Sequence, residues 1–239
     1  PFNAPHFPTA GNKQPGQPNI WQAPDWAFKD IGLNPDEADP KRRYDAVVFA
    51  LDKAIGRVLA ALDKANAADN TFVFFMSDNG AFRLGRKGLD VGLNTPLRHG
   101  GVTCWEGGLR VCAIARWPGK IKAGSVANAM VQYVDVVPTL LEAVGGSAVE
   151  GLDGRSFLGV LRGEADEHHD AVFGVHTTRG IINGSPCYPV RSIRTATHKY
   201  IWNPKYTEPF RNVLIGGRDK GGYWNSWVEL AKTDANARR

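Results

Sequence analysis

The stretch FVFFMSDNGAF, residues 72–82, places a carboxylate and an amide directly after an apolar run. Asp78 and Asn79 offer hard oxygen ligands, which suit Ca²⁺ or Mg²⁺. The same Asp-Asn-Gly sequence is also typical of a tight hairpin turn. The preceding run is continuous rather than alternating, so we expect the end of a buried strand, where ligands bind in open α/β sheets. Two residues cannot complete a coordination shell, and by themselves they leave a metal site and an ordinary turn both open.

A long amphipathic helix precedes that strand. Asp39 is a predicted N-cap, and Pro40 occupies the first helical position. Apolar residues then recur at spacings of three and four, which predicts a helix over roughly residues 41–65. A helix that leads into a continuous apolar strand, residues 71–76, is half of a βαβ unit, and burial on both faces indicates a parallel sheet. The apolar face comprises Val47, Leu51, Ile55, Val58, Leu59 and Leu62.

Less regular segments flank these elements. Residues 1–39 are rich in Pro, Asn and Gln and should be irregular, apart from a short strand leading into FNAPH. Residues 80–108 form a long glycine-rich connection, which inside a compact domain is usually functional or disordered. Asp135 is expected to cap a helix that carries Pro138 in its first turn. We also expect a second buried strand over 109–117, a short helix over 156–161, strands over 171–176, 190–196 and 198–203, and a helix within 221–239.

The composition limits the classes of function. The 239 residues are 43% hydrophobic and 22% charged, as in ordinary globular proteins. The net charge of +5 is spread along the chain without a basic run or a nucleic-acid-binding motif. No apolar run approaches the length of a membrane span. Because the chain begins without Met or a signal-peptide pattern and its last helix has no cap, we expect a fragment or a processed chain.

The order of five blocks resembles the sulfatases of the alkaline-phosphatase superfamily. The blocks are NAPHFP, YDAVVFALDKAIGRVLAALDKA, NTFVFFMSDNG, TPLRHGGVTCWEGGLRVCAIARWPGKI and YVDVVPTLLEAVG. They agree with the family in spacing and order from residue 1 to about residue 160, which is more specific than any single motif. The later block HTTRGIINGSPCYPVRSIRTATHKYIWN is similar to the C-terminal subdomain of the branch that includes the heparan N-sulfatases and bacterial polysaccharide sulfatases.

The resemblance implies a metal-assisted sulfate hydrolase. Asp78 and Asn79 would be two ligands of a divalent cation, Ca²⁺ or Mg²⁺, and His6 would contact the sulfate or protonate the leaving group. The family's nucleophile is a formylglycine made from Cys or Ser in a C/S-x-P-x-R motif. Cys187 begins a literal match, C-Y-P-V-R, but it lies late in the chain before a strand-like segment. We therefore interpret it as a chance match and expect the formylglycine and the remaining metal ligands outside this chain, which should be inactive alone.

One block departs from the family pattern. Sulfatases commonly carry a lysine that grips the sulfate, and counting back from Trp105 that position is Gly101. Arg98 or His99, and less directly Lys87, would then have to supply the charge, because a guanidinium or an imidazolium binds sulfate well. An ordinary loop role for Arg98 and His99 is the alternative.

Substrate contacts are expected from the C-terminal part, because polar loops there rim the pocket in related enzymes. Arg191 alternates with Arg194 along a predicted strand and could equally face solvent. His168 and His169 lie in an acidic segment, which we interpret as an exposed turn without a metal role. The candidates for substrate recognition are His176, Arg179, Asn183 and Arg191.

The predicted fold is α/β: an alkaline-phosphatase-like mixed, largely parallel sheet with helices on both faces, plus a small antiparallel C-terminal subdomain. Residues 1–165 would belong to the catalytic domain and residues 166–239 to the subdomain. The whole protein would hydrolyse a sulfate ester or sulfamate on a sulfated carbohydrate, or an aryl sulfate, in a periplasmic, secreted or lysosomal setting, with no nucleic-acid partner. Two alternatives are a phosphodiesterase or phosphonate hydrolase on the same fold, and a non-catalytic binder of sulfated glycans, which the absence of lysine at Gly101 would favour.

Overall fold

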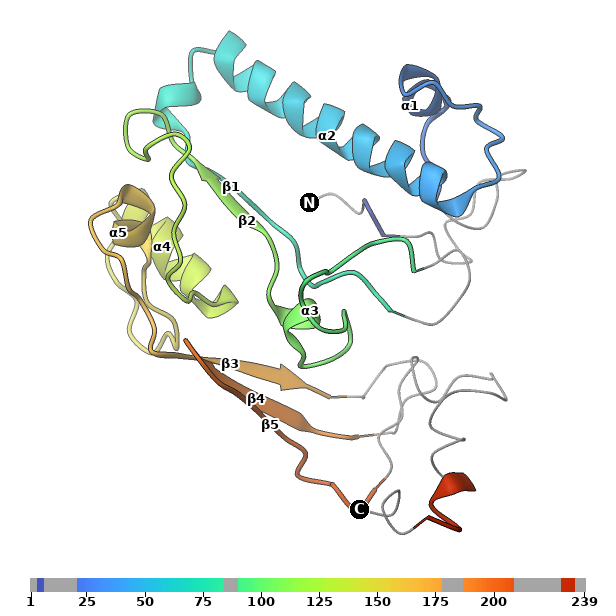
Figure 1. The fold of residues 1–239 in the computed structure, drawn as a ribbon. Helices are drawn as coiled ribbons and strands as arrows, with labels where there is room; N and C mark the ends of the chain where they lie inside the picture. Colours follow the sequence, from blue (N-terminus) through green and yellow to red (C-terminus); the bar gives the residue numbers. More distant parts are fainter. Residues whose placement is uncertain (1–3, 7–20, 84–89, 178–186, 209–228, 235–239) are drawn as a thin grey trace.

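A computed structural model describes residues 4–6, 21–83, 90–177, 187–208 and 229–234 of the chain. Two separate sheets, β1–β2 and β3–β4–β5, lie on either side of the short helix α3 (Figure 1). The elements are α1 (Asp25–Asp30), α2 (Pro40–Lys64), η2 (Ala68–Asn70), β1 (Val73–Met76), α3 (Glu106–Leu109), β2 (Ala113–Arg116), η3 (Tyr133–Asp135), α4 (Val136–Ala143), α5 (Leu158–Arg162), β3 (Ala171–His176), β4 (Val190–Thr195) and β5 (Lys199–Trp202).

The predicted long helix is confirmed as α2. The Asp39 carboxylate accepts a hydrogen bond from the backbone N–H of Lys41 at 2.7 Å, and Pro40 is the first helical residue. Ala46 and Val47 are buried near the start of α2, where α1 contacts it, whereas Val58 is 51% exposed. The apolar face is therefore covered mainly over its first turns. Of the helices in the described ranges, none has the length and apolarity needed to cross a bilayer.

Helix α1 corrects the expectation that residues 1–39 are irregular. Its first turn carries Asp25 and its last turn Lys29, which suits the helix dipole. Ala27 and Phe28 are fully buried, so packing against α2 stabilises a helix that is too short to be stable alone. Residues 4–6 form a turn, and the rest of the strand predicted near FNAPH lies outside the described residues.

A buried arginine joins α2 to the segment between α1 and α2. Arg43 is 2% exposed, and its Nη1 donates hydrogen bonds to the carbonyl oxygens of Pro35 and Glu37, both at 3.0 Å. Its guanidinium also lies 4.8 Å from the centroid of the Phe28 ring. The side chain thus satisfies two backbone acceptors while covering an aromatic face.

Replacing Arg43 with alanine is expected to lower the free energy of unfolding by about 2–4 kcal/mol, because two carbonyl groups lose their donor. Urea denaturation of the full-length protein would measure the change. Arg42→Ala is the matched control, since the exposed Arg42 pairs with the partly buried Glu37 at 3.1 Å, and the loss of this single ion pair should cost about 1 kcal/mol or less. Equal losses of stability in the two variants would contradict the role of Arg43 as the donor to the Pro35 and Glu37 carbonyl groups.

The strands β1 and β2 lie where the sequence predicts, but their environment differs. They pair antiparallel, with Val73 opposite Arg116 and Met76 opposite Ala113. The loop through α3 reverses the chain, so β2 returns beside β1. Ile114 is 61% exposed, so the expected burial of both strands on both faces is wrong for the described chain. All described strand pairs are antiparallel, and the largely parallel sheet stays a prediction.

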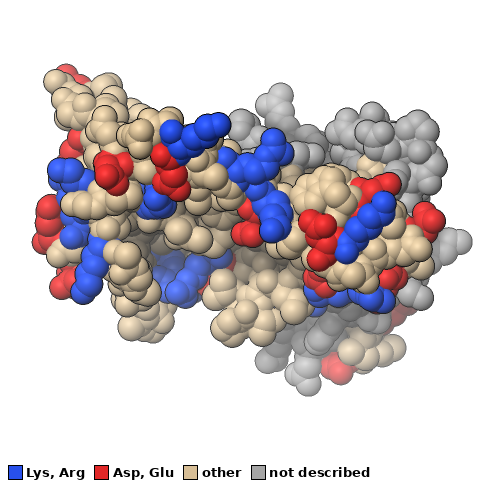
Figure 2. Space-filling model, turned by 90° about the horizontal axis from the view of Figure 1, so that it is seen from above, with Lys and Arg blue, Asp and Glu red and all other residues tan. Residues whose placement is uncertain are grey.

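The small antiparallel C-terminal sheet is confirmed. The order β3–β4–β5 is a meander, and β4 and β5 form the predicted hairpin. Cys104, from the loop before α3, is buried with Tyr188, Val190 and the partly buried Ile201, so the loop and this sheet share one apolar cluster. Figure 2 shows Lys and Arg interspersed with Asp and Glu on the face it presents, as the even spread of charge along the sequence indicates.

Helices α4 and α5 confirm the two predicted helical segments that follow β2. Asp135 stands at the N-cap position of α4, but its carboxylate makes no capping hydrogen bond to that helix. It instead accepts hydrogen bonds from the backbone N–H groups of Gln132, at 2.7 Å, and Arg155, at 3.0 Å. The helix predicted within residues 221–239 lies mainly outside the described residues.

Candidate functional site

The two predicted metal ligands follow β1 directly. The exposed Asp78 accepts a hydrogen bond from the backbone N–H of Asn79 through Oδ1, at 2.8 Å, and Asn79 Nδ2 donates to the carbonyl of Gly80 at 2.9 Å. Asp78 Oδ2 and Asn79 Oδ1 therefore accept no hydrogen bond from the described residues. Two adjacent oxygen acceptors of this kind fit a hard cation such as Ca²⁺, as part of a shell of six to eight oxygens.

The backbone beside these ligands is held by neighbouring segments. Ser77 donates its N–H to the Cys112 carbonyl at 3.3 Å and its hydroxyl to the Asn79 carbonyl at 2.9 Å. The Tyr133 hydroxyl donates to the Ser77 carbonyl. Burial, followed by the charges of Asp78 and Cys112, raises the pKa of Tyr133, so this donor keeps its proton at neutral pH.

Four glycines bring α3 and the loop before it against the segment that follows β1. We call Gly80, Gly101, Gly107 and Gly108 the glycine junction. The N–H of Gly80 donates to the Gly108 carbonyl at 3.1 Å, and that of Gly101 donates to the Ala81 carbonyl at 3.1 Å. A Cβ atom at Gly80 would lie 1.7 Å from the carbonyl oxygen of Gly107. The backbones therefore approach at a distance that admits no side chain.

Asn94 links the loop before α3 to the segment that follows β1. Its amide accepts from the Ala81 N–H at 2.9 Å and donates to the carbonyls of Ala81, at 2.8 Å, and His99, at 2.9 Å. His99 and Val102 adopt φ angles of +63° and +60°, which are unfavourable for residues other than glycine. The loop is thus held in a strained form. Sequence reasoning missed Asn94, because an asparagine in a glycine-rich loop carries no distinctive signal.

Arg98 and His99 differ in their charge and their surroundings. Burial lowers the pKa of His99, and the positive charges of Arg83 and Arg98 lower it further, so the ring is neutral at pH 7. The lowered pKa disfavours an imidazolium at this position, and a sulfate contact from His99 stays a prediction. Its buried Nδ1 has no hydrogen-bond partner in the described chain. The Arg98 guanidinium lies 4.1 Å from the centroid of the Trp105 ring and keeps its charge.

His6 lies against the same segment. Its ring stands edge-on to Phe82 with centroids 6.0 Å apart. A Cβ atom at Gly101 would lie 2.8 Å from Cδ1 of Phe82 and 2.7 Å from the Gly80 carbonyl oxygen. Gly101, where the family commonly carries lysine, thus has no room for a side chain on this backbone. Asp78 and Asn79 lie within residues 77–82. The His6 ring contacts this segment at Phe82, and the loop that carries His99 contacts it at Ala81.

The C-terminal candidates form a separate group on the three-stranded sheet. His176 ends β3 opposite Val190, and Arg191 lies on β4 opposite Val175. Burial lowers the pKa of His176, whereas Arg191 is exposed and donates to the Val190 carbonyl at 3.1 Å. A substrate role for them stays a prediction. Three further candidates lie outside the described residues: Lys87, Arg179 and Asn183.

An ion-pair network ties this sheet to the glycine junction. Glu106, at the start of α3, pairs with Arg194 of β4 at 3.0 Å and with Lys199 of β5 at 2.7 Å. Burial opposes ionisation of Glu106, but the hydrogen bond and charge of Lys199, with the charge of Arg194, hold its pKa below the usual range. The network therefore fixes β4 and β5 relative to the residues that follow Trp105.

Cys187 is exposed and lies shortly before β4, next to the buried Tyr188. A position before a strand is consistent with the interpretation of C-Y-P-V-R as a chance match, which stays a prediction.

The interpretation of His168 and His169 as an exposed turn is wrong. Their side chains are 6% and 17% exposed, and both face the fully buried Asp135. The carboxylate lies at the start of α4, more than thirty residues earlier in the chain, and no local pattern indicates that such segments meet. His169 Nε2 lies 2.9 Å from Asp135 Oδ2.

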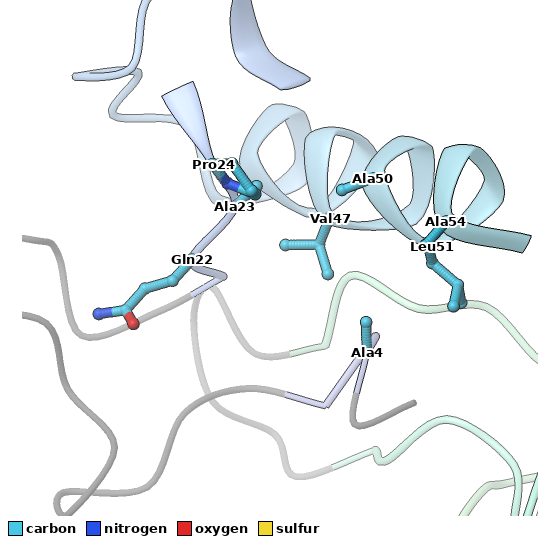
Figure 3. Close-up of a pocket in the computed structure, with 8 residues that line it drawn as sticks. All are labelled: Ala4, Gln22, Ala23, Pro24, Val47, Ala50, Leu51 and Ala54. Carbon is cyan, nitrogen blue, oxygen red and sulfur yellow. The ribbon is translucent and has the colours of Figure 1, made fainter. Parts of the chain in front are cut away.

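A shallow cavity of about 240 Å³ lies between the N-terminal segment and α2. Figure 3 shows Ala4 facing Val47 and Leu51 of α2 across it. Of its eight lining residues, Gln22 alone carries a polar side chain, so the cavity has no charged group for an anionic ester. We therefore do not place the candidate site there.

Comparison with known families and curated proteins places these features in context. Residues 1–146 match the sequence model of the family described as sulfatase, and residues 102–209 match the model described as N-sulphoglucosamine sulphohydrolase, C-terminal. The ulvan-active sulfatase of Formosa agariphila is 36% identical over 62% of this chain and 26% of its own length. Human N-acetylgalactosamine-6-sulfatase is 39% identical over 46% and 22%. The chain thus spans about a quarter of the length of these curated relatives.

Solved structures support the fold. Ps i-CgsB superposes with a TM-score of 0.62 at 24% identity, over 97% of this chain and 48% of its own. A protein solved with its substrate, D-glucosamine-2-N,6-O-disulfate, gives a TM-score of 0.51 at 25% identity, over 80% and 38%. The phosphonate monoester hydrolase of Silicibacter pomeroyi gives 0.52 at 22% identity, over 83% and 40%.

The sulfatase match covers more than half of the chain, and the matched residues include Asp78, Asn79 and the glycine junction. The predicted α/β fold with a small antiparallel C-terminal sheet is confirmed. The chain therefore belongs to the sulfatase family.

Proposed function

We propose that the protein containing this chain hydrolyses a sulfate ester or sulfamate on a carbohydrate. The observation that carries the proposal is the pair of oxygen atoms, Asp78 Oδ2 and Asn79 Oδ1, which accept no hydrogen bond from the described residues and lie just after β1 in a sulfatase-family chain. These residues would hold Ca²⁺ or Mg²⁺ together with ligands from outside the chain, and the bound cation would neutralise the oxygens of the sulfate group.

The residues around Asp78 and Asn79 would each have a distinct task. Arg98 carries a permanent charge held over Trp105 and would attract the anionic ester. His99 is neutral and would offer a hydrogen bond rather than a charge. His6 would donate the proton that the leaving oxygen or nitrogen requires. The nucleophile, formylglycine by family resemblance, is expected outside residues 1–239.

The substrate class is proposed from the relatives. One is named for ulvan, another for N-acetylgalactosamine 6-sulfate, and a solved neighbour holds a disulfated glucosamine. The C-terminal match to N-sulphoglucosamine sulphohydrolase lies over the sheet that carries His176 and Arg191. We therefore propose a sulfated sugar whose ring contacts this sheet while its sulfate group lies near Asp78.

Full-length protein should be tested on N-sulfated and 6-O-sulfated glucosamine, sulfated N-acetylgalactosamine, ulvan oligosaccharides, an aryl sulfate and an aryl phosphonate monoester. Sulfate release, followed by ion chromatography, should be fastest on a sulfated sugar and should stop on removal of divalent cations. Faster cleavage of the phosphonate ester would favour the phosphonate hydrolase alternative. Saturable binding of the sulfated sugars with no turnover would show a non-catalytic homologue instead.

A further inference from the structure

The cluster of Asp135, His168 and His169 lies apart from the residues assigned to sulfate hydrolysis. Asp135 immediately precedes α4, and the two histidines lie just before β3. One ligating atom from each residue falls within 4.8 Å of the others. The cluster therefore joins the segment entering α4 to the segment entering the three-stranded sheet.

We propose that Asp135, His168 and His169 form a binding site for a borderline transition-metal cation of the Zn²⁺ type. Two imidazole nitrogens and one carboxylate oxygen are a common zinc donor set, and they are poorly suited to Ca²⁺ or Mg²⁺, which prefer oxygen ligands. A solvent molecule would complete the coordination shell.

The spacing of the three donor atoms supports a tetrahedral centre. Asp135 Oδ2 lies 2.9 Å from His169 Nε2 and 3.5 Å from His168 Nε2. Ligands about 2.0 Å from a tetrahedral zinc ion lie about 3.3 Å from one another. The two separations from the carboxylate lie on either side of this value, and the two histidine nitrogens lie within 4.8 Å of each other, so binding needs side-chain adjustments rather than a rearrangement of the backbone.

A buried nitrogen without a partner points to a ligand at this position. The His168 side chain is 6% exposed, and its Nε2 makes no hydrogen bond within the described part of the chain. Its distance of 3.5 Å from the carboxylate is too long for a normal hydrogen bond. A buried polar atom left in this way is costly unless something binds it. A cation between His168 and the carboxylate would satisfy it.

The surroundings also orient the carboxylate donor. Asp135 is already oriented by the N–H groups of Gln132 and Arg155, which act as the outer shell that metal-binding carboxylates usually have. The positive charge of Arg155 would repel the bound cation, and the negative charge of the Asp135 carboxylate would offset this repulsion.

Titration of metal-free full-length protein with Zn²⁺ and Co²⁺ tests this site. We expect one equivalent of Zn²⁺ to bind and to raise the unfolding midpoint, and bound Co²⁺ to show the strong visible absorption of a tetrahedral centre. His168→Gln and His169→Gln should each lower the affinity for Zn²⁺ by about 10-fold or more, whereas the exposed His198→Gln should leave it unchanged.

The test is independent of the proposed hydrolase activity. The double variant Asp78→Ala/Asn79→Ala should keep the Zn²⁺ equivalent, and Ca²⁺ should not compete for it. X-ray absorption of the zinc-loaded wild type should show two imidazole ligands, which keeps the proposal testable should a histidine variant fail to fold. Absence of Zn²⁺ binding, or equal binding by both folded histidine variants and wild type, would overturn the proposal and leave the cluster as a buried hydrogen-bonded contact.

Discussion

Replacing Asp78 with alanine in the full-length protein is expected to lower kcat/KM for a sulfated sugar by about 10³-fold or more, because the substitution removes the charged member of the proposed metal ligands. Its Oδ2 is one of the two oxygens that no described residue satisfies. Asn79→Ala should have a smaller effect in the same direction, since it removes a neutral ligand. Steady-state kinetics, together with calorimetric titration of Ca²⁺ and Mg²⁺, would measure both losses.

Two controls make the Asp78 result interpretable. Asp69→Ala removes an exposed carboxylate from η2, at the other end of β1, and should leave both activity and cation affinity unchanged. Stability in the absence of metal should change little in Asp78→Ala, because within the described ranges the Asp78 side chain makes one local hydrogen bond, to Asn79. Unchanged cation affinity in the Asp78 variant would contradict its assignment as a ligand, whatever the activity.

A single methyl group at Gly107 is expected to destabilise the protein by about 3 kcal/mol. A Cβ atom there would lie 2.2 Å from the carbonyl oxygen of His99 and 2.6 Å from that of Arg98. The loop must move away from α3, and the hydrogen bond from Gly107 N–H to the Arg98 carbonyl, now 2.8 Å, would break. Because catalytic groups must be placed to within about 1 Å, kcat/KM should also fall by about 10²-fold.

Gly56→Ala provides the matched comparison for the glycine junction. Gly56 lies within α2, and a Cβ atom at this position would meet nothing within 4 Å. Alanine there should stabilise the helix by about 1 kcal/mol and leave activity unchanged. Thermal or urea unfolding of the two variants would report the difference. A Gly107→Ala protein as stable as wild type would show that the close approach of these backbones is not required.

Local sequence signals predicted the helices α2, α4 and α5. Asp39-Pro40 and the spacing of the apolar residues placed α2, and Asp135 with Pro138 placed α4. Helix α1 was missed because its stability comes from burying Ala27 and Phe28 against α2, which composition cannot show. The pairing of β1 with β2 was also beyond reach, since a continuous apolar strand can join either a parallel or an antiparallel neighbour.

In the candidate site, too, some features could be predicted from the sequence and others could not. The motif order alone pointed to Asp78, Asn79 and His6, because these residues lie inside blocks with a specific spacing. The neutral state of His99 depends on burial and on Arg83 and Arg98, which the fold brings near it. The contacts of Asn94 with Ala81 and His99 depend likewise on where the loop returns.

By itself, the sequence determined the membership of this chain in the sulfatase family and its helices α2, α4 and α5, because each is encoded in residues close together along the chain. It also predicted Asp78 and Asn79 as metal ligands. The tertiary structure decided which distant segments meet. It brought Gly80 against Gly107, and it buried His168 and His169 against Asp135. Such contacts depend on chain reversals and packing between segments dozens of residues apart, for which residue types and spacing carry no signal.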